Sequence, residues 1–205
     1  MKTESVMFAI AGVIFGLIAG WVIGAQQATM RAPAAAPAPA SAAASAGEGG
    51  TRAVSLDEAQ VTALKSVAGR EPANAQPRVQ LGNLYFDAEK YDDAIKWYGD
   101  ALKLEPKDVN VSTDLGVSFY YSNQPDKALT QFDQSLKLDP KHAKTLLNVG
   151  IVKAFGKQDL EGAMRAWQQV LEIAPDSAEG QAAKRALDSM RSAHPAGTTP
   201  AKPGA

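Results

Sequence analysis

A period of 34 residues organises the middle of the chain and restricts its possible folds more than any other feature. The landmarks are three glycines (Gly82, Gly116, Gly150), spaced by 34, and three prolines (Pro106, Pro140, Pro175), spaced by 34 and 35. Such a period is typical of folds that stack one supersecondary unit on the next. Between the landmarks, apolar residues recur every three to four positions, which predicts amphipathic helices. We therefore expect an all-α solenoid of about three helix-turn-helix units.

The residue types at the recurring positions have physical reasons. Gly82 and Ala94 are small, so the two helices of the first unit can cross closely. Tyr98 then fills the space between successive hairpins. Pro106 follows the second helix because the residue before a proline avoids the helical region.

The recurring positions define a specific pattern. The first unit carries Leu81, Gly82, Tyr85, Ala94, Tyr98, Ala101 and Pro106, and the second carries Leu115, Gly116, Phe119, Ala128, Phe132, Ser135 and Pro140. The third carries Val149, Gly150, Lys153, Ala163, Trp167, Val170 and Pro175, and we place its one extra residue in the turn between its helices. The pattern resembles the tetratricopeptide repeat (TPR) family over about residues 73–176, of the membrane-anchored type found in bacteria.

The repeats predict the boundaries of one domain, residues 55–193. We place the units at about 75–108, 109–142 and 143–177. Residues 55–69 are predicted to form a helix in phase with the second half of a degenerate unit, since Pro72 precedes Pro106 by 34. Residues 177–192 are predicted to form a C-terminal capping helix, because a solenoid needs a polar outer face at its end. The tail 194–205 is predicted to be disordered.

The resemblance implies a concave groove, lined by the first helix of each unit, that binds extended or helical peptides. The family positions that face such a groove correspond here to Val79, Asn83, Phe86, Asp87, Thr113, Val117, Tyr120, Tyr121, Leu147, Ile151, Ala154 and Phe155. Chaperone-binding members grip a C-terminal carboxylate with Lys and Asn. Asn83 matches the Asn, whereas Val79 stands at the Lys position, so we do not expect chaperone-tail recognition. The Tyr, Phe and aliphatic residues suit an apolar or aromatic anchor.

The N-terminal region has a different character. After a short tail (1–4), residues 5–25 contain no charge and would span about 31 Å as a helix, close to the bilayer core of about 30 Å. We predict a transmembrane helix, the alternative being a cleaved signal peptide. Gly12, Gly16, Gly20 and Gly24 share one face of it and suit close helix association, either with a second copy in a homo-oligomer or with a helix of another protein. Residues 26–54, rich in Ala and Pro, are predicted to be a disordered linker.

Composition and motifs give no sign of catalysis. The chain has no Cys, two His and a net charge of −1, which argues against Cys-ligated metals, His cages and nucleic-acid binding by a broad basic surface. No phosphate loop, HExxH or GxSxG motif occurs. We expect no catalytic, cofactor-binding or metal-binding residue. His142, in a turn between units, is expected to be solvated or to have a capping role.

These patterns together predict a membrane-anchored scaffold or assembly factor that binds a partner protein or peptide and has no enzymatic activity. The alternative is an exported soluble binding protein, released after cleavage of a signal peptide. We place the repeat domain in the periplasm, on the outer face of a bacterial inner membrane. Lys2 flanks one side of the predicted anchor, while Arg31 lies six residues past Ala25 on the other. The sequence does not name the partner or the pathway.

Overall fold

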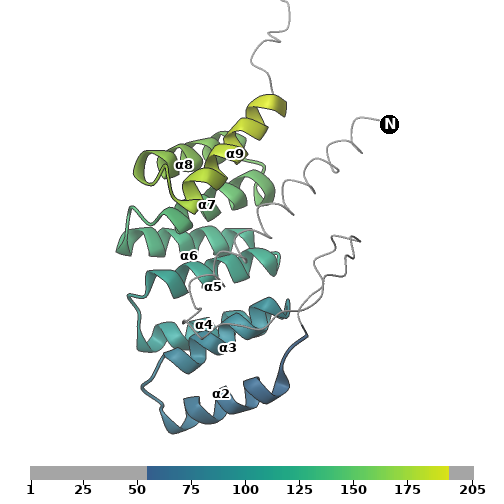
Figure 1. Ribbon diagram of the computed structural model, residues 1–205, viewed down its shortest axis with the longest axis vertical. Coiled ribbons are helices and arrows are strands. Elements are labelled where there is room, and N and C mark those ends of the chain that lie inside the picture. The colour runs from purple at the N-terminus through teal and green to yellow at the C-terminus, as the bar shows by residue number, and fades with distance from the viewer. Residues whose placement is uncertain (1–54, 194–205) are drawn as a thin grey trace, which may run out of the picture. The chain divides into compact units, whose positions relative to one another are not determined.

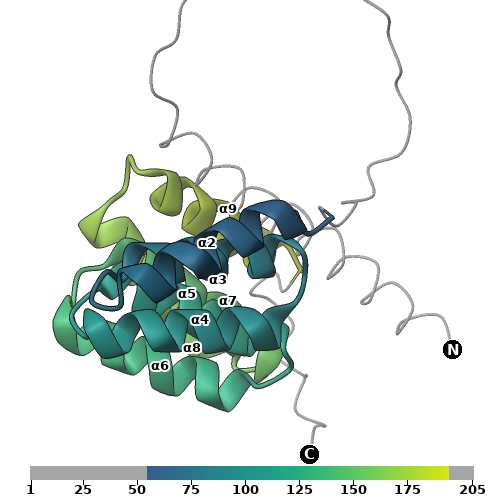
Figure 2. The same cartoon turned by 90° about the horizontal axis from the view of Figure 1, so that it is seen from below.

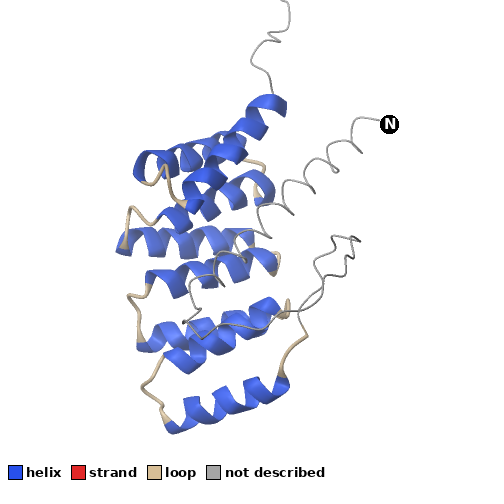
Figure 3. Ribbon diagram, viewed as in Figure 1, coloured by secondary structure: helices blue, strands red, loops and turns tan. Residues whose placement is uncertain are grey.

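The computed structural model describes residues 55–193, so the predicted tail 1–4, anchor 5–25, glycine ladder, linker 26–54 and tail 194–205 lie outside the described residues. The described part is all helical, which confirms the predicted class (Figures 1 and 3). Its elements are α2 (Glu58–Arg70), α3 (Gln76–Asp87), α4 (Tyr91–Leu104), α5 (Val109–Tyr121), α6 (Pro125–Leu138), α7 (Ala143–Ile151), the π-helical segment η1 (Val152–Gly156), α8 (Leu160–Ile173) and α9 (Ala178–Ala193).

The helices stack as pairs, in the order of the chain. The pairs α3–α4, α5–α6 and α7–α8 are the three units, and each packs against the next. α2 packs on α3 at one end of the stack, and α9 packs on α8 and α7 at the other (Figure 1; Figure 2 looks from the α2 end). Each helix therefore buries its apolar face against sequence neighbours, as expected for a solenoid.

Helix boundaries follow from local chemistry. The side chains of Asp57, Asp108 and Asp159 accept hydrogen bonds from backbone N–H groups in the first turns of α2, α5 and α8. An Asp at this position satisfies donors that have no partner within the helix. At the other end, α4 and α6 end just before the residues that precede Pro106 and Pro140, as the restriction before proline predicts.

A glycine of the first helix meets an aromatic ring of the second helix in every unit. A Cβ added at Gly82 would lie 2.5 Å from Cδ1 of Tyr98, and Cβ atoms at Gly116 and Gly150 would likewise overlap the rings of Phe132 and Trp167. Phe132 and Trp167 are almost fully buried. Only glycine leaves room for these rings, which explains the 34-residue glycine period.

The extra residue of the third unit does not lie where the sequence predicts it. We expected it in the turn between the helices, but this turn has the same length as in the other units, at residues 88–90, 122–124 and 157–159. The extra residue lies instead in the first helix, which ends in the π-helical segment η1. Backbone hydrogen bonds in a π-helix join residues five apart rather than four apart, so each turn holds more residues. The turn keeps its shape because it needs a left-handed residue, Gln158 (φ 56°), matching Glu89 and Asn123.

Candidate peptide-binding surface

Seven of the predicted groove residues are partly exposed on the first helices of the units. They are Val79, Asn83, Phe86 and Asp87 on α3, Tyr120 and Tyr121 on α5, and Phe155 in η1. We call the part of the molecule that they form the first-helix surface. Whether it binds a peptide is not tested by the structure and stays a prediction.

The other predicted groove residues are buried. Val117 (9% exposed), Leu147 (1%), Ile151 (8%) and Thr113 (0%) belong to the core, as does Ala154. Leu147 and Ile151 lie on α7, in the unit against which α9 packs. Thr113 lies between units, with its hydroxyl 2.7 Å from that of Thr145. These residues therefore offer no free surface to a partner.

Rings from two units form an aromatic cluster at one end of the first-helix surface: Phe86, Tyr91, Tyr120 and Tyr121. Phe86 meets Tyr91 and Tyr121 edge to face, with ring centroids 5.4 and 5.5 Å apart. Tyr91 stacks on Tyr121 at 5.2 Å, and Tyr120 meets Tyr121 at 5.7 Å. Pairs at these distances are favourable beyond the area that they bury. The cluster joins the first unit to the second through four partly exposed rings.

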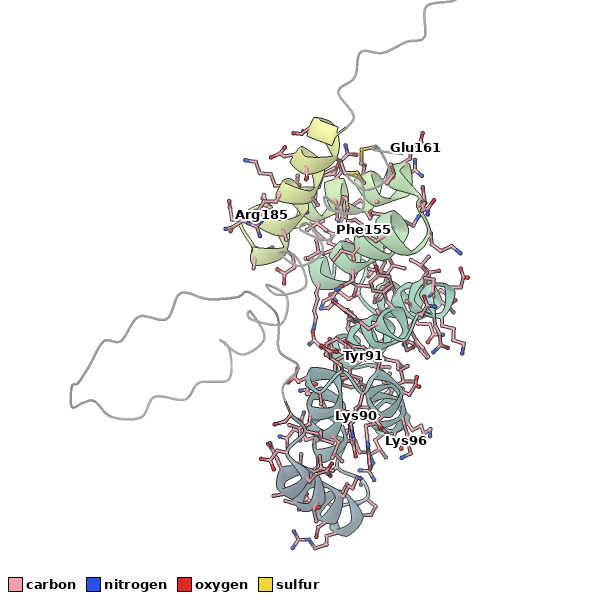
Figure 4. All side chains as sticks on the ribbon, turned by 90° about the vertical axis from the view of Figure 1, so that its right-hand side faces the viewer. Lys90, Tyr91, Lys96, Phe155, Glu161 and Arg185 are labelled. Carbon is pink, nitrogen blue, oxygen red and sulfur yellow. The ribbon has the colours of Figure 1, made fainter. Side chains whose placement is uncertain are left out.

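The aromatic cluster lies beside the turns within the units. Figure 4 faces this edge of the stack and shows Tyr91, next to Lys90 at the first turn, below Phe155 at the end of η1. The third unit continues the contact, because a Cβ at Gly156 would lie 3.1 Å from the Tyr120 ring. Aromatic side chains thus follow the edge across three units.

A polar stripe runs beside the aromatic cluster. It consists of Asn83 and Asp87 on α3, Asp114 on α5 and Lys144 on α7. The Tyr98 hydroxyl donates to Oδ1 of Asn83 at 2.6 Å, and Lys144 Nζ lies 2.6 Å from Oδ1 of Asp114. The two members of this ion pair are each 18% exposed. The stripe therefore fixes side chains from three units with hydrogen bonds of good geometry.

Burial, partial for Asp87 and Tyr121 and nearly complete for Tyr98, shifts the pKa of three groups on this side of the stack. Burial raises the pKa of Asp87 above its ordinary value. Burial, with smaller contributions from Tyr91 and Tyr120, raises the pKa of Tyr121 to about 12. Burial also raises the pKa of Tyr98, and the negative charges of Asp114 and Asp87 raise it further. Both carboxylates therefore lie close enough to the Tyr98 hydroxyl to act on it.

His142 is neither fully solvated nor the side-chain cap of α7, since its side chain makes no capping hydrogen bond. Its Nδ1 lies 2.7 Å from the Thr145 hydroxyl and its Nε2 lies 3.2 Å from Oδ1 of Asn110. Thr113 completes this polar network between the second and third units. The arrangement is structural, because it ties α5 to the start of α7.

Sequence reasoning missed Tyr91, Tyr98, Asp114 and Lys144 as contributors. Tyr91 begins a second helix, so its position in the repeat does not mark it as surface-forming. Asp114 and Lys144 are 30 residues apart, which is the 34-residue repeat minus about one turn of an α-helix. This spacing places the two side chains face to face across neighbouring units. That spacing is the signal that could have found the pair.

The fold shows that this is a helical-repeat protein built from two-helix units. Two family models then match the chain, one described as TPR repeat over residues 82–122 and one as tetratricopeptide repeat over residues 113–179. The chain therefore contains tetratricopeptide repeats over residues 82–179. Such repeats generally mediate protein–protein interaction, and the fold is typically a non-enzymatic module. No curated protein matches the chain.

Solved structures show the same fold. The crystal structure of MamA is 17% identical, with a TM-score of 0.53, and the match covers 63% of this chain and 83% of that one. The first TPR of Spaghetti (RPAP3) bound to the HSP90 peptide SRMEEVD is 25% identical, with a TM-score of 0.53 and coverages of 58% and 94%. The first TPR domain of human RPAP3 is 24% identical, with a TM-score of 0.51 and coverages of 58% and 93%.

Proposed function

We propose that this protein is an interaction scaffold or assembly factor that binds a peptide segment of a partner protein along the first-helix surface. The observation that carries the proposal is the aromatic cluster, which keeps four rings from two units partly exposed on one edge. Aromatic side chains of this kind dominate the energetics of protein interfaces. The similar Spaghetti TPR with its bound peptide supports the same use of the fold.

Site-specific photo-crosslinking of the full-length chain in its own cells tests this function. A photoreactive phenylalanine analogue replaces Phe86 or Tyr91 on the surface. Leu138, 42% exposed on the second helix of its unit, and Leu104, 37% exposed, are matched controls. We expect a discrete partner adduct from the first two positions and none from the leucines. Adducts from the leucines alone would place the partner on the second helices and refute the proposal.

We further propose that residues 5–25 anchor the protein in a bacterial inner membrane, with the repeat domain in the periplasm. Among residues 55–193, no helix is long and apolar enough to span a membrane. The support for the proposal is the uncharged N-terminal run. Mass spectrometry of the mature N-terminus separates the anchor from the exported soluble alternative, since only the anchor keeps the segment.

Topology and anchor association have tests of their own. Protease added to intact spheroplasts should degrade the repeat domain or its linker, and full protection would reverse the orientation. The Gly16→Ile, Gly20→Ile double variant should weaken helix association in a membrane reporter assay, because branched side chains separate the two backbones. An unchanged signal would show that the glycine spacing does not drive association.

A further inference from the structure

Asp87 stands out on the first-helix surface because no side chain of residues 55–193 is found to neutralise it. It is half-buried at the end of α3, and no hydrogen bond or ion pair of its carboxylate occurs among these residues. Burial raises the pKa of its carboxyl above the ordinary value. A carboxylate held in this way disfavours its own charged form.

The cation in the polar stripe is already engaged. Lys144 pairs with Asp114 at 2.6 Å. Asp114 and Asp87 both act on the Tyr98 hydroxyl, so they lie in the same neighbourhood. The three ionisable groups of the stripe therefore carry a net formal charge of −1, and this charge resides on Asp87.

Two partly exposed aromatic residues, Phe86 and Tyr91, lie within four residues of Asp87 in the sequence. Phe86 directly precedes Asp87 and contacts Tyr91 edge to face. Both rings are partly exposed. Aromatic faces attract cations through the ring quadrupole, and a guanidinium can stack on a ring while it donates to a carboxylate.

We propose that this corner of the first-helix surface, formed by Asp87, Phe86 and Tyr91, takes a basic side chain of the partner peptide, with arginine preferred over lysine. The inference rests on the proposed function and names the anchor that the bound peptide carries. Charge complementarity selects this occupant, since an acidic anchor would be repelled and a wholly apolar one would bury Asp87 without a partner. A planar guanidinium meets both the rings and the carboxylate, whereas an ammonium acts as a point charge.

Selection from a random dodecapeptide display library against the immobilised full-length chain tests the proposal. Parallel selections use the Asp87→Asn and Asp87→Lys variants, with Asp133→Asn as the control, because Asp133 is exposed on α6. We expect peptides rich in arginine with wild type and with the control. The arginine preference should vanish with Asp87→Asn and turn to acidic residues with Asp87→Lys.

A double-mutant cycle on one selected peptide makes the test quantitative. Replacing its arginine with citrulline, which keeps the shape and removes the charge, should weaken binding to wild type about tenfold. The same replacement should change binding to Asp87→Asn less than about threefold, since the partner charge is gone. Equal losses for both proteins would overturn the proposal.

The outcomes also separate this inference from the proposed function. Selected peptides that lose binding on Phe86→Ser substitution but show no basic preference support the surface and refute the basic anchor. Selected peptides indifferent to both Phe86→Ser and Asp87→Asn, or a selection without enriched peptides, refute the surface and the anchor together.

Discussion

Gly82 of α3 lies directly beneath the ring of Tyr98 of α4, so closely that a single added methyl carbon would approach Cδ1 to 2.5 Å. The contact sets the crossing of the first two-helix unit. It also positions the Tyr98 hydroxyl to donate to Asn83 on the first-helix surface. One glycine thus connects the packing of the repeat with the geometry of the candidate site.

Gly82→Ala should lower the free energy of unfolding by about 1–3 kcal/mol, because the new methyl group overpacks the crossing. Gly99→Ala is the matched control, since a Cβ there meets nothing within 4 Å. In α4 the control should gain about 0.5–1 kcal/mol from helix propensity alone. Urea denaturation of the full-length chain, followed by circular dichroism, measures both. A neutral Gly82→Ala would show that Tyr98 can move aside.

Tyr121→Ala should destabilise the fold by about 1–3 kcal/mol, because the ring contacts Phe86, Tyr91 and Tyr120. Tyr121→Phe keeps these ring contacts and serves as the control, with an expected change within about 0.5 kcal/mol. Thermal denaturation measures the two variants side by side. Equal melting temperatures for Tyr121→Ala and wild type would contradict the structural role of the cluster.

Asp87→Asn should stabilise the protein at pH 7. Burial raises the folded-state pKa of Asp87 above its ordinary value of 3.8. A carboxyl group whose pKa is higher in the folded than in the unfolded protein stabilises the fold fully at pH values below its unfolded-state pKa. This stabilisation is lost as the pH rises through the folded-state pKa. The variant should therefore exceed wild type in stability at pH 7, and the gain should shrink toward pH 4. A variant less stable than wild type at pH 7 would reveal a cation paired with Asp87.

His142 should make the domain sensitive to mild acid. Burial lowers its pKa below 6.5, Lys144 lowers it too, and Asp139, Asp114 and Glu179 oppose the shift. A histidine whose pKa is lower in the folded than in the unfolded protein stabilises the fold at pH values above its unfolded-state pKa. This stabilisation is lost as the pH falls through the folded-state pKa. Wild type should lose more stability than His142→Gln between about pH 7.5 and pH 5.

The matched control for the acid experiment is His194→Gln, which removes the only other histidine of the chain. Its urea denaturation curves should follow the pH dependence of wild type. The role assigned to His142 would be contradicted if His142→Gln and wild type lost equal stability over the same pH interval.

The repeat architecture could be predicted because its determinants are local and recur. Gly116 and Phe132, or Gly150 and Trp167, keep their residue types at nearly fixed separations, so sequence alone indicates the close crossings. The position of the extra residue could not be predicted in this way. The extra residue could lie either in the turn or in the first helix. The turn needs Gln158 in the left-handed region, whereas the helix can widen into η1. Which of the two costs less free energy depends on tertiary packing, which the repeat pattern does not contain.

The candidate surface was predictable only in part, for a related reason. Family positions place Phe86 and Tyr121 correctly on first helices, but exposure depends on neighbours that the pattern does not contain. Leu147 and Ile151 are buried in the unit on which α9 packs. Tyr91 joins the cluster from a second helix, across the turn. Packing between units, rather than the period itself, decides which side chains remain accessible.

Hydrogen–deuterium exchange of the full-length chain, with and without the partner segment identified by crosslinking, tests the central claim most directly. The account predicts slower exchange on binding at the ends of α3 and α5 and the start of α4, where the aromatic cluster and Asp87 lie. Exchange in α6 and α8 should not change. Protection confined to α6 and α8, with α3 and α5 unaffected, would contradict the claim that the first-helix surface is the binding device.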